Sequence, residues 1–137
     1  MDDDLIGEND LPKLLQSMSP LLLEQEYVFA TFAQAKYGDH ANLQPFASVI
    51  EAEGLTLIIE KSTAERHDIE FHAVFKAITL QVHSSLEAVG LTAAVATKLA
   101  ECGVSANVVA GYFHDHIFVQ SESAELAVSV LSELADR

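Results

Sequence analysis

The two halves of the sequence carry the same pattern of elements. Residues 56–60 (Thr-Leu-Ile-Ile-Glu) and 116–120 (His-Ile-Phe-Val-Gln) both have the character of short strands, and they lie sixty positions apart. Each is followed at once by a helix start, Ser-Thr-Ala-Glu at 62–65 and Glu-Ser-Ala-Glu at 122–125. A chain of 137 residues built on such a repeat is expected to form two similar small units.

The repeat is interrupted in the first half. Residues 11–18 and 27–32 match the helix around Leu91 and the strand at 106–111, but at an offset near eighty. The change of offset indicates an insertion of about twenty residues in the first half, between residues 33 and 54. This interruption is expected to set the first half apart from the second.

The C-terminal half shows its elements most clearly. Residues 76–82 alternate as a strand, and apolar residues recur at helical spacing through 89–102, where Gly103 suits a left-handed C-cap. Residues 106–112 and 116–119 predict two strands joined by a tight turn, and an amphipathic helix closes the chain. The predicted order is strand, helix, strand, strand, helix.

The N-terminal half predicts a related unit. Ser62 and Glu65 have the spacing of a capping box, so a short helix is expected to begin there, and residues 69–75 predict one more strand. We therefore predict an α+β fold of two ferredoxin-like (βαββαβ) halves, residues 1–68 and 69–137. In each half an antiparallel sheet is expected to carry its helices on one face.

Composition excludes several classes of function. Half of the residues are apolar, which excludes disorder, and no apolar run approaches the roughly 20 residues of a membrane span. The net charge of -14 disfavours nucleic acid and anionic membrane surfaces as partners. The acidic first residues differ from a secretory signal, so we expect a cytoplasmic protein.

Several motifs of the C-terminal half are similar to those of ACT domains. They are Ala-Val-Gly-Leu at 88–91, Leu-Ala-Glu at 99–101, Gly-Val at 103–104 and Asn-Val-Val at 107–109. The stretch 75–134 resembles a family of small bacterial tandem ACT-like proteins without an assigned activity. Residues 53–57 of the first half are similar to the same family, and to the ACT pair of the animal arginine sensors.

This resemblance implies regulation instead of catalysis. ACT domains bind amino acids or other small metabolites at domain or subunit interfaces, and the loop before the first helix contacts the ligand. The resemblance places that loop here at residues 83–90. We also expect a homo-oligomer, in particular a dimer. The candidate ligand-binding residues are His83, Ser84, Ser85, Leu86, Glu87, Val89, Gly90, Leu91 and Asn107. No cofactor and no metal are expected.

Physical chemistry supports the same loop. Gly90 opens a helix, lets a bound group approach the backbone closely, and leaves the free N–H groups of the first turn for a carboxylate. A hydroxyl of Ser84 or Ser85 can hydrogen-bond a ligand, and Glu87 can meet an ammonium group. ACT loops often carry Asp or Asn with Pro before the glycine, and the difference here leaves the ligand open. Alternatively, Ser84 and Glu87 form a capping box that needs no ligand.

Other reactive residues have structural interpretations. His114, Asp115 and His116 could present two imidazoles to a metal ion, but the triplet is expected at a hairpin turn without a third ligand. Cys102, the only cysteine, stands at a helix C-terminus that disfavours a thiolate, so we expect it to be buried and structural. No phosphate-binding glycine motif and no nucleophile elbow occur.

Two functions remain open from the sequence. The first is a regulatory sensor that binds a small metabolite, plausibly an amino acid, at the loop before Gly90. The second is a non-catalytic, homo-oligomeric interaction module without a metabolite, which assembles through sheet edges or apolar helix faces. In both interpretations the protein is not an enzyme. A third alternative, placed after these two, is an enzyme that uses the histidine triplet with a metal.

Overall fold

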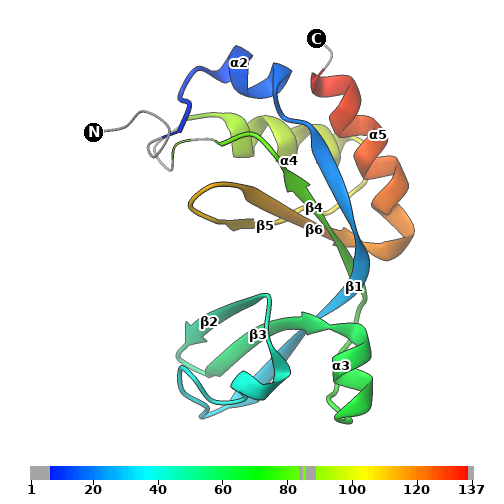
Figure 1. Cartoon of the computed structure of the whole chain (residues 1–137). Coiled ribbons are helices and arrows are strands. Elements are labelled where there is room, and N and C mark those ends of the chain that lie inside the picture. The colour runs from blue at the N-terminus through cyan, green and yellow to red at the C-terminus, as the bar shows by residue number, and fades with distance from the viewer. Residues whose placement is uncertain (1–6, 84, 86–88, 136–137) are drawn as a thin grey trace. The chain divides into compact units, whose positions relative to one another are not determined.

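The computed structural model describes residues 7–83, 85 and 89–135 of the chain (Figure 1). The chain folds into two compact units. The C-terminal unit consists of Met1–Leu23 together with Lys76–Arg137, and the inserted unit consists of Glu24–Phe75. The division predicted at residues 68 and 69 concerns the repeated sequence and stays a prediction. The compact units are delimited differently, because the first helix packs within the C-terminal unit.

The strands hydrogen-bond in the order β2-β3-β1-β4-β6-β5. Strand β1 (Pro20–Ala33) is the longest, and it contributes its first residues to the C-terminal unit and the rest to the inserted unit. Each unit therefore needs a part of the same strand. The fold is of the α+β class with antiparallel pairing, as the sequence predicts.

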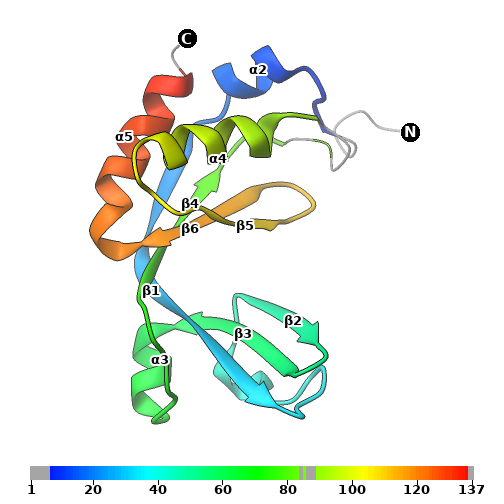
Figure 2. The same cartoon turned by 180° about the vertical axis from the view of Figure 1, so that it is seen from behind.

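The C-terminal unit contains β4 (Phe75–Leu80), α4 (Leu91–Glu101), β5 (Asn107–Ala110) and β6 (Asp115–Gln120) in chain order. A short 3-10 turn, η2 (Ser121–Ser123), then leads into α5 (Ala124–Ala135), and α2 (Leu11–Gln16) joins the unit from the start of the chain. In both views α4 lies along the β5–β6 hairpin (Figures 1 and 2). These elements confirm the predicted order. Gly103 has the left-handed φ of 78° expected of a C-cap.

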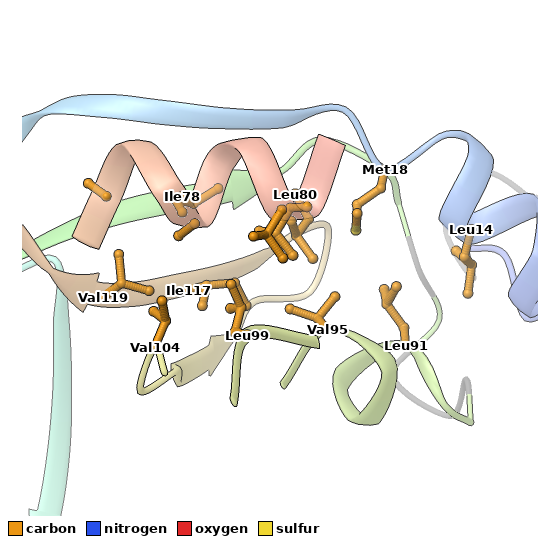
Figure 3. Close-up of a cluster of buried hydrophobic side chains, with 14 residues drawn as sticks. Leu14, Met18, Ile78, Leu80, Leu91, Val95, Leu99, Val104, Ile117 and Val119 are labelled. Carbon is orange, nitrogen blue, oxygen red and sulfur yellow. The ribbon is translucent and has the colours of Figure 1, made fainter. Parts of the chain in front are cut away.

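The helices cover one face of this sheet because alternate strand residues are apolar. Ile78 and Leu80 of β4 point to the same face, as residues two apart in a strand must, and Ile117 of β6 joins them. Leu91, Val95 and Leu99 of α4 meet these side chains, together with Leu14 and Met18 from α2 and its end (Figure 3). Burying one leucine of this kind contributes about 1.5 to 3 kcal/mol.

The inserted unit uses the same pairing with shorter helical elements. After β1 come η1 (Ala41–Leu43), β2 (Ala47–Glu51), β3 (Gly54–Glu60) and α3 (Lys61–Arg66). Strand β3 pairs with β1 from Tyr27↔Glu60 to Ala33↔Gly54, and with β2 on its other side. A small core joins β1, β3 and α3, through Val28 of β1, Leu57 and Ile59 of β3 and Ala64 of α3.

Two predictions for this region are wrong. Of residues 69–75, only Phe75 belongs to a strand, because Ile69, Phe71 and Val74 pack on the small core without a paired backbone. The capping box of Ser62 and Glu65 is not formed, since α3 begins at Lys61 and Glu60 is its N-cap. Strand β3 runs directly into this helix through the extended backbone of Glu60, which leaves no room for a separate cap.

Candidate functional site at the start of α4

The predicted ligand loop joins β4 to α4 at the end of the C-terminal unit. Ser84, Leu86 and Glu87 lie outside the described residues. His83, Ser85, Val89, Gly90 and Leu91 are described, and they come from both ends of the loop. The geometry of the site therefore depends on these five residues and on the segments that pack against them.

The start of the chain binds to this loop. The backbone N–H of Glu8 donates to the carbonyl of His83, and the N–H of Ser85 donates to the carbonyl of Glu8, both at 2.9 Å. Ser85 is buried. Residues 7–11, here called the N-terminal strap, therefore lie beside His83 and Ser85. The two hydrogen bonds of Glu8 thus attach the strap to the loop that was predicted to hold a ligand.

Local hydrogen bonds fix the path of the strap. The Glu8 carboxylate accepts from the backbone N–H groups of Asn9 and Asp10, at 3.0 and 3.3 Å. Asp10 is the N-cap of α2, and its Oδ1 accepts from the N–H of Lys13 at 3.3 Å. The strap therefore enters α2 in one orientation, with Leu11 as the first helical residue.

Gly90 is the N-cap of α4 and has the left-handed φ of 102°. Its carbonyl accepts the N–H of Ala94, and as a glycine it offers no side-chain cap to the first turn of the helix. The alternative interpretation, a capping box of Ser84 and Glu87, falls on residues outside the described part of the chain and stays a prediction. An added Cβ at Gly90 would lie 3.1 Å from Cδ2 of Leu11. The strap thus covers one approach to the glycine.

The neighbours of Gly90 face opposite directions. Val89 is 84% exposed, and Leu91 is buried in the hydrophobic core (Figure 3). The Leu91 side chain cannot reach a ligand from this position, and its contribution is limited to the backbone N–H at the start of the helix.

The His83 side chain contacts two aromatic rings of the β5–β6 turn. Its ring centroid lies 4.8 Å from that of Phe113 and 6.2 Å from that of Tyr112, and the latter two rings meet edge to face at 5.1 Å. Its Nε2 atom is buried and has no hydrogen-bond partner in the part of the chain that the structure describes. Such an atom costs free energy unless a partner arrives, so His83 has an unused hydrogen-bonding site.

Sequence reasoning did not identify Tyr112 and Phe113. Both are about half exposed, although they are large and apolar. The available signal was two consecutive aromatic residues at a predicted tight turn, where small polar residues are usual. Gly111 closes this turn by donating its N–H to the carbonyl of His114 at 2.9 Å.

Asn107 lies at the other end of the hairpin from Phe113. It is the first residue of β5, it is exposed, and its Nδ2 donates to the carbonyl of Phe118 at 3.2 Å. Strand residues advance about 3.3 Å each, so three residues separate Asn107 from the turn by roughly 10 Å. The structure gathers the other described candidates around the loop and leaves Asn107 away from them.

Two histidines of the triplet make hydrogen bonds to β4 and to the segment just after it. His116 Nδ1 lies 2.9 Å from Oγ1 of Thr79 in β4, and His114 Nδ1 lies 3.4 Å from the Val82 carbonyl. Only His114 lies in the turn, since β6 already begins at Asp115. Among residues 7–83, 85 and 89–135, no three His, Cys, Asp or Glu side chains are placed to hold a metal ion.

Burial changes the acidity of two members of the triplet. It raises the pKa of Asp115 above its usual value, while the adjacent His116 and His114 partly oppose this rise. Burial, and to a lesser degree the charge of His114, lowers the pKa of His116, against the influence of Asp115. Both shifts favour the uncharged forms inside the hairpin.

The buried role predicted for Cys102 is wrong. The thiol is free and exposed at the C-cap of α4. Leu99 is the last residue of α4 that faces the core, and Gly103 then turns the chain away, so the side chain of residue 102 faces outward.

The fold and the motifs define a class of protein. Two family models, both described as ACT domain, match residues 6–76 and 74–133. The chain therefore belongs to the ACT-domain family, and its fold is a tandem of two ACT units, as the resemblance of the sequence implied. No curated protein matches the sequence.

Solved structures of the same fold include an uncharacterised protein and regulatory subunits. A Vibrio cholerae protein of unknown function, described as a possible transport protein, is 55% identical with a TM-score of 0.83, over 91% of this chain and 95% of that one. The ligand-free regulatory subunit of Thermus thermophilus aspartate kinase is 9% identical with a TM-score of 0.65, over 86% of this chain and 97% of that one. An Agrobacterium tumefaciens protein is 17% identical with a TM-score of 0.68, over 85% and 87%. The two last likenesses show the fold alone.

The Vibrio protein is described as a possible transport protein, so we asked whether a helix of this chain could cross a membrane. Of the helices in the described part, none has the length and apolar character that a membrane crossing requires.

Proposed function

We propose that this protein is a regulatory sensor that binds a small metabolite, an amino acid in our hypothesis, at the loop His83 to Gly90 of the C-terminal unit. The family supports the general part of this proposal, because ACT domains are typically regulatory, ligand-binding modules. The choice of an amino acid and the choice of this loop are ours.

The observation that carries the proposal is the uncapped start of α4. Gly90 stands at the N-cap of an eleven-residue helix, and a glycine at this position has no side chain with which to satisfy the N–H groups of the first turn. A helix start of this kind favours a carboxylate, since the N–H groups and the helix dipole both attract negative charge. Every amino acid carries such a carboxylate.

His83 supplies a second, independent support. The imidazole can accept a hydrogen bond from an ammonium group or donate one to a carboxylate, depending on its tautomer. Its buried Nε2 lacks a partner among the described residues, and Phe113 packs against its ring. An amino acid that satisfied this atom would remove the cost of leaving it unpaired.

A thermal-shift panel of the twenty amino acids tests the proposal. A binder present at 100 times its dissociation constant stabilises the folded chain by about 2.7 kcal/mol. We expect at least one amino acid to raise the melting temperature of the wild type, and His83→Phe to remove that rise, because it keeps a ring against Phe113 but deletes Nε2. His67→Phe, at an exposed histidine of the inserted unit, is the matched control and is expected to keep the response.

Panel results can also contradict this site. If none of the twenty amino acids raised the melting temperature of the wild type, the amino-acid proposal would be contradicted. A response that survives His83→Phe unchanged would contradict the role given to His83.

We further propose that the protein is non-catalytic and acts in the cytoplasm by transmitting occupancy to a partner. Both matched family models belong to a regulatory domain, which supports the first part. The single cysteine is free, which fits a reducing compartment.

A second candidate function is assembly through a sheet edge. Strand β2 lies at one edge of the strand order and exposes Val49 (50%) and Ile50 (69%). Exposed apolar edge strands pair with other chains unless charges protect them. If a homodimer forms through β2, Ile50→Lys is expected to convert it to a monomer in sedimentation velocity, whereas Leu126→Lys, at an exposed residue of α5, is not.

A further inference from the structure

We propose that the tip of the β5–β6 hairpin is a pH-sensitive switch, which His114, Asp115 and His116 hold closed at neutral pH and release in mild acid. The hairpin tip is defined here as residues 111–114. This inference goes beyond the proposed function and does not depend on it, because it concerns a local opening of the chain without a ligand. It gives a role to the histidine triplet, which the proposed function does not use.

Two imidazoles attach this end of the hairpin to the neighbouring strand. His116 Nδ1 lies 2.9 Å from Oγ1 of Thr79 in β4, and His114 Nδ1 lies 3.4 Å from the carbonyl oxygen of Val82, just after β4. Strands β4 and β6 are also neighbours in the sheet, so these side-chain contacts add to strand pairing close to the turn. The attachment of the tip therefore depends on side chains that change charge with pH.

His116 also packs against the turn itself. A Cβ added at Gly111 would lie 3.6 Å from His116 Nε2. The backbone closes the turn at the same place, where the N–H of Gly111 donates to the carbonyl of His114 at 2.9 Å. A turn that opened at Gly111 would therefore bring the His116 imidazole into contact with water.

Asp115 lies on the opposite face of β6. It shares that face with Ile117, which belongs to the buried core, because residues two apart in a strand point to the same side. Asp115 is only 8% exposed, and its partner across the hairpin is the apolar Ala110. A carboxylate in this position is penalised for the loss of water, so the closed tip favours the uncharged carboxyl group.

The surroundings of His116 on the other strands are neutral. Strand β4 contacts it through Thr79, and β5 pairs with it through Val109. Helices α4 and α5 cover the face of the sheet that is opposite to His116. The charged or titratable side chains of the neighbouring elements are Lys76 of β4, His83 of the segment after it, Lys98 and Glu101 of α4, and Glu125 and Glu133 of α5.

The sign of the pH effect follows from burial. Burial, and then the charge of His114, lowers the pKa of His116 in the closed tip from its ordinary value of 6.5, against the influence of Asp115. The open tip therefore binds the proton more strongly, and opening is favoured as the pH falls through 6.5 toward the pKa of the closed form. Burial raises the pKa of Asp115, so protonation of this carboxyl group has the opposite sign and favours closure.

Opening changes the surface that the hairpin presents. The tip carries Tyr112 and Phe113, whose rings meet edge to face and are about half exposed. In the closed tip the Phe113 ring centroid lies 4.8 Å from that of His83. Release of the tip removes this contact, so acid increases the aromatic surface that faces solvent.

Hydrogen exchange on the full-length chain tests the switch between about pH 5 and 8, the range in which histidine changes charge. The Gly111 amide reports the turn, and the Val104 amide, which donates to the Leu99 carbonyl at 2.9 Å, is the reference within the same unit. After correction for the intrinsic rate, we expect protection of Gly111 to fall below pH 6.5. The fall is at most about tenfold per pH unit, the limit for one proton. At every pH we expect Gly111 to be less protected than Val104, because the opening is local.

Three substitutions assign the effect to side chains. His116→Gln should remove the fall in Gly111 protection, because glutamine does not titrate. Asp115→Asn should make the fall steeper, because it deletes the group of opposite sign. Thr79→Val deletes the hydroxyl contact and should speed Gly111 exchange about two- to tenfold. Its matched control Thr79→Ser keeps the hydroxyl and should stay closer to the wild type.

Three results would overturn the switch. A Gly111 protection that did not change with pH would remove the effect, and a fall that persisted in His116→Gln would remove its cause. Equal protection of Gly111 and Val104 would show that the tip opens only when the whole unit unfolds. If a variant does not fold, the comparison of these two amides in the wild type still decides the question. None of these results bears on the amino-acid panel, so the proposed function stands or falls separately.

Discussion

The C-terminal unit and the inserted unit follow one plan but differ in their helices. Between its first two strands the C-terminal unit has the eleven residues of α4, where the inserted unit has the three residues of η1. After the hairpin the C-terminal unit has the twelve residues of α5, and the inserted unit has the six of α3. Both units keep antiparallel pairing. The two units therefore share their strand pairing and differ in helix length. A feature that needs a long helix is expected only in the C-terminal unit.

This difference separates a unit with a candidate site from one without. A binding site at a helix start needs a helix long enough to have an uncapped first turn and a dipole. Only α4 combines such a length with a glycine at its N-cap in the described part of the chain. The inserted unit contributes an exposed edge strand instead, so the two units are expected to serve different purposes.

The largest effect is expected in the core that supports α4. Leu99→Ala removes a fully buried side chain of the C-terminal core and should lower the free energy of unfolding by about 2 to 5 kcal/mol. Leu126→Ala, at an exposed position of α5, should change it by less than about 0.5 kcal/mol. Denaturant titration measures both. Equal losses would contradict the assignment of α4 as the packed element of this unit.

Alanine substitutions at two glycines, one in each unit, distinguish the cost of backbone strain from the cost of crowding the strap. Gly38 and Gly90 both have left-handed backbones, but a Cβ at Gly38 meets nothing within 4 Å. Gly38→Ala should therefore cost only the left-handed penalty of about 1 to 2 kcal/mol. Gly90→Ala should cost about 1 kcal/mol more, because the new methyl group crowds Leu11.

A double-mutant cycle sharpens this comparison. In a Leu11→Ala background the excess cost of Gly90→Ala is expected to disappear, since the methyl group then has space. Denaturant titration of the four chains gives the coupling. An excess that persists without the Leu11 side chain would show that the strap does not crowd Gly90.

The smallest effect concerns pH. The pKa of His116 is lowered in the folded chain from its ordinary value of 6.5, so the unfolded chain binds more protons just below that pH. Stability is therefore expected to fall as the pH drops through 6.5 toward the folded-state pKa. His116→Gln should flatten this part of the profile of unfolding free energy against pH.

The elements of the C-terminal unit were predictable because their signals are local. The spacing of Leu91, Val95 and Leu99 and the glycine at position 103 are readable within a few turns of chain. Residues 69–74 misled the prediction because an alternating apolar pattern also suits side chains that pack on a core without strand pairing. Cys102 misled it because the last turn of a helix can rotate its final residue away from the core.

The surroundings of the site were not predictable from local signals. The loop residues followed from the family resemblance and from the glycine before a helix. The bridge from Glu8 to His83 and Ser85, and the packing of Phe113 on His83, join segments far apart in sequence, and neither pattern reveals its partner. Leu11 was assigned to a helix correctly, but its position over Gly90 depends on tertiary packing alone.

The most direct measurement of the central claim is amide chemical-shift mapping of the full chain, titrated with the amino acid that gives the largest thermal shift. The account predicts saturable shifts at the amides of Gly90, Leu91 and Thr92 and at the His83 imidazole, with the amides of β3 and α3 unchanged. Shifts confined to the inserted unit, or none at the start of α4 despite binding, would contradict it.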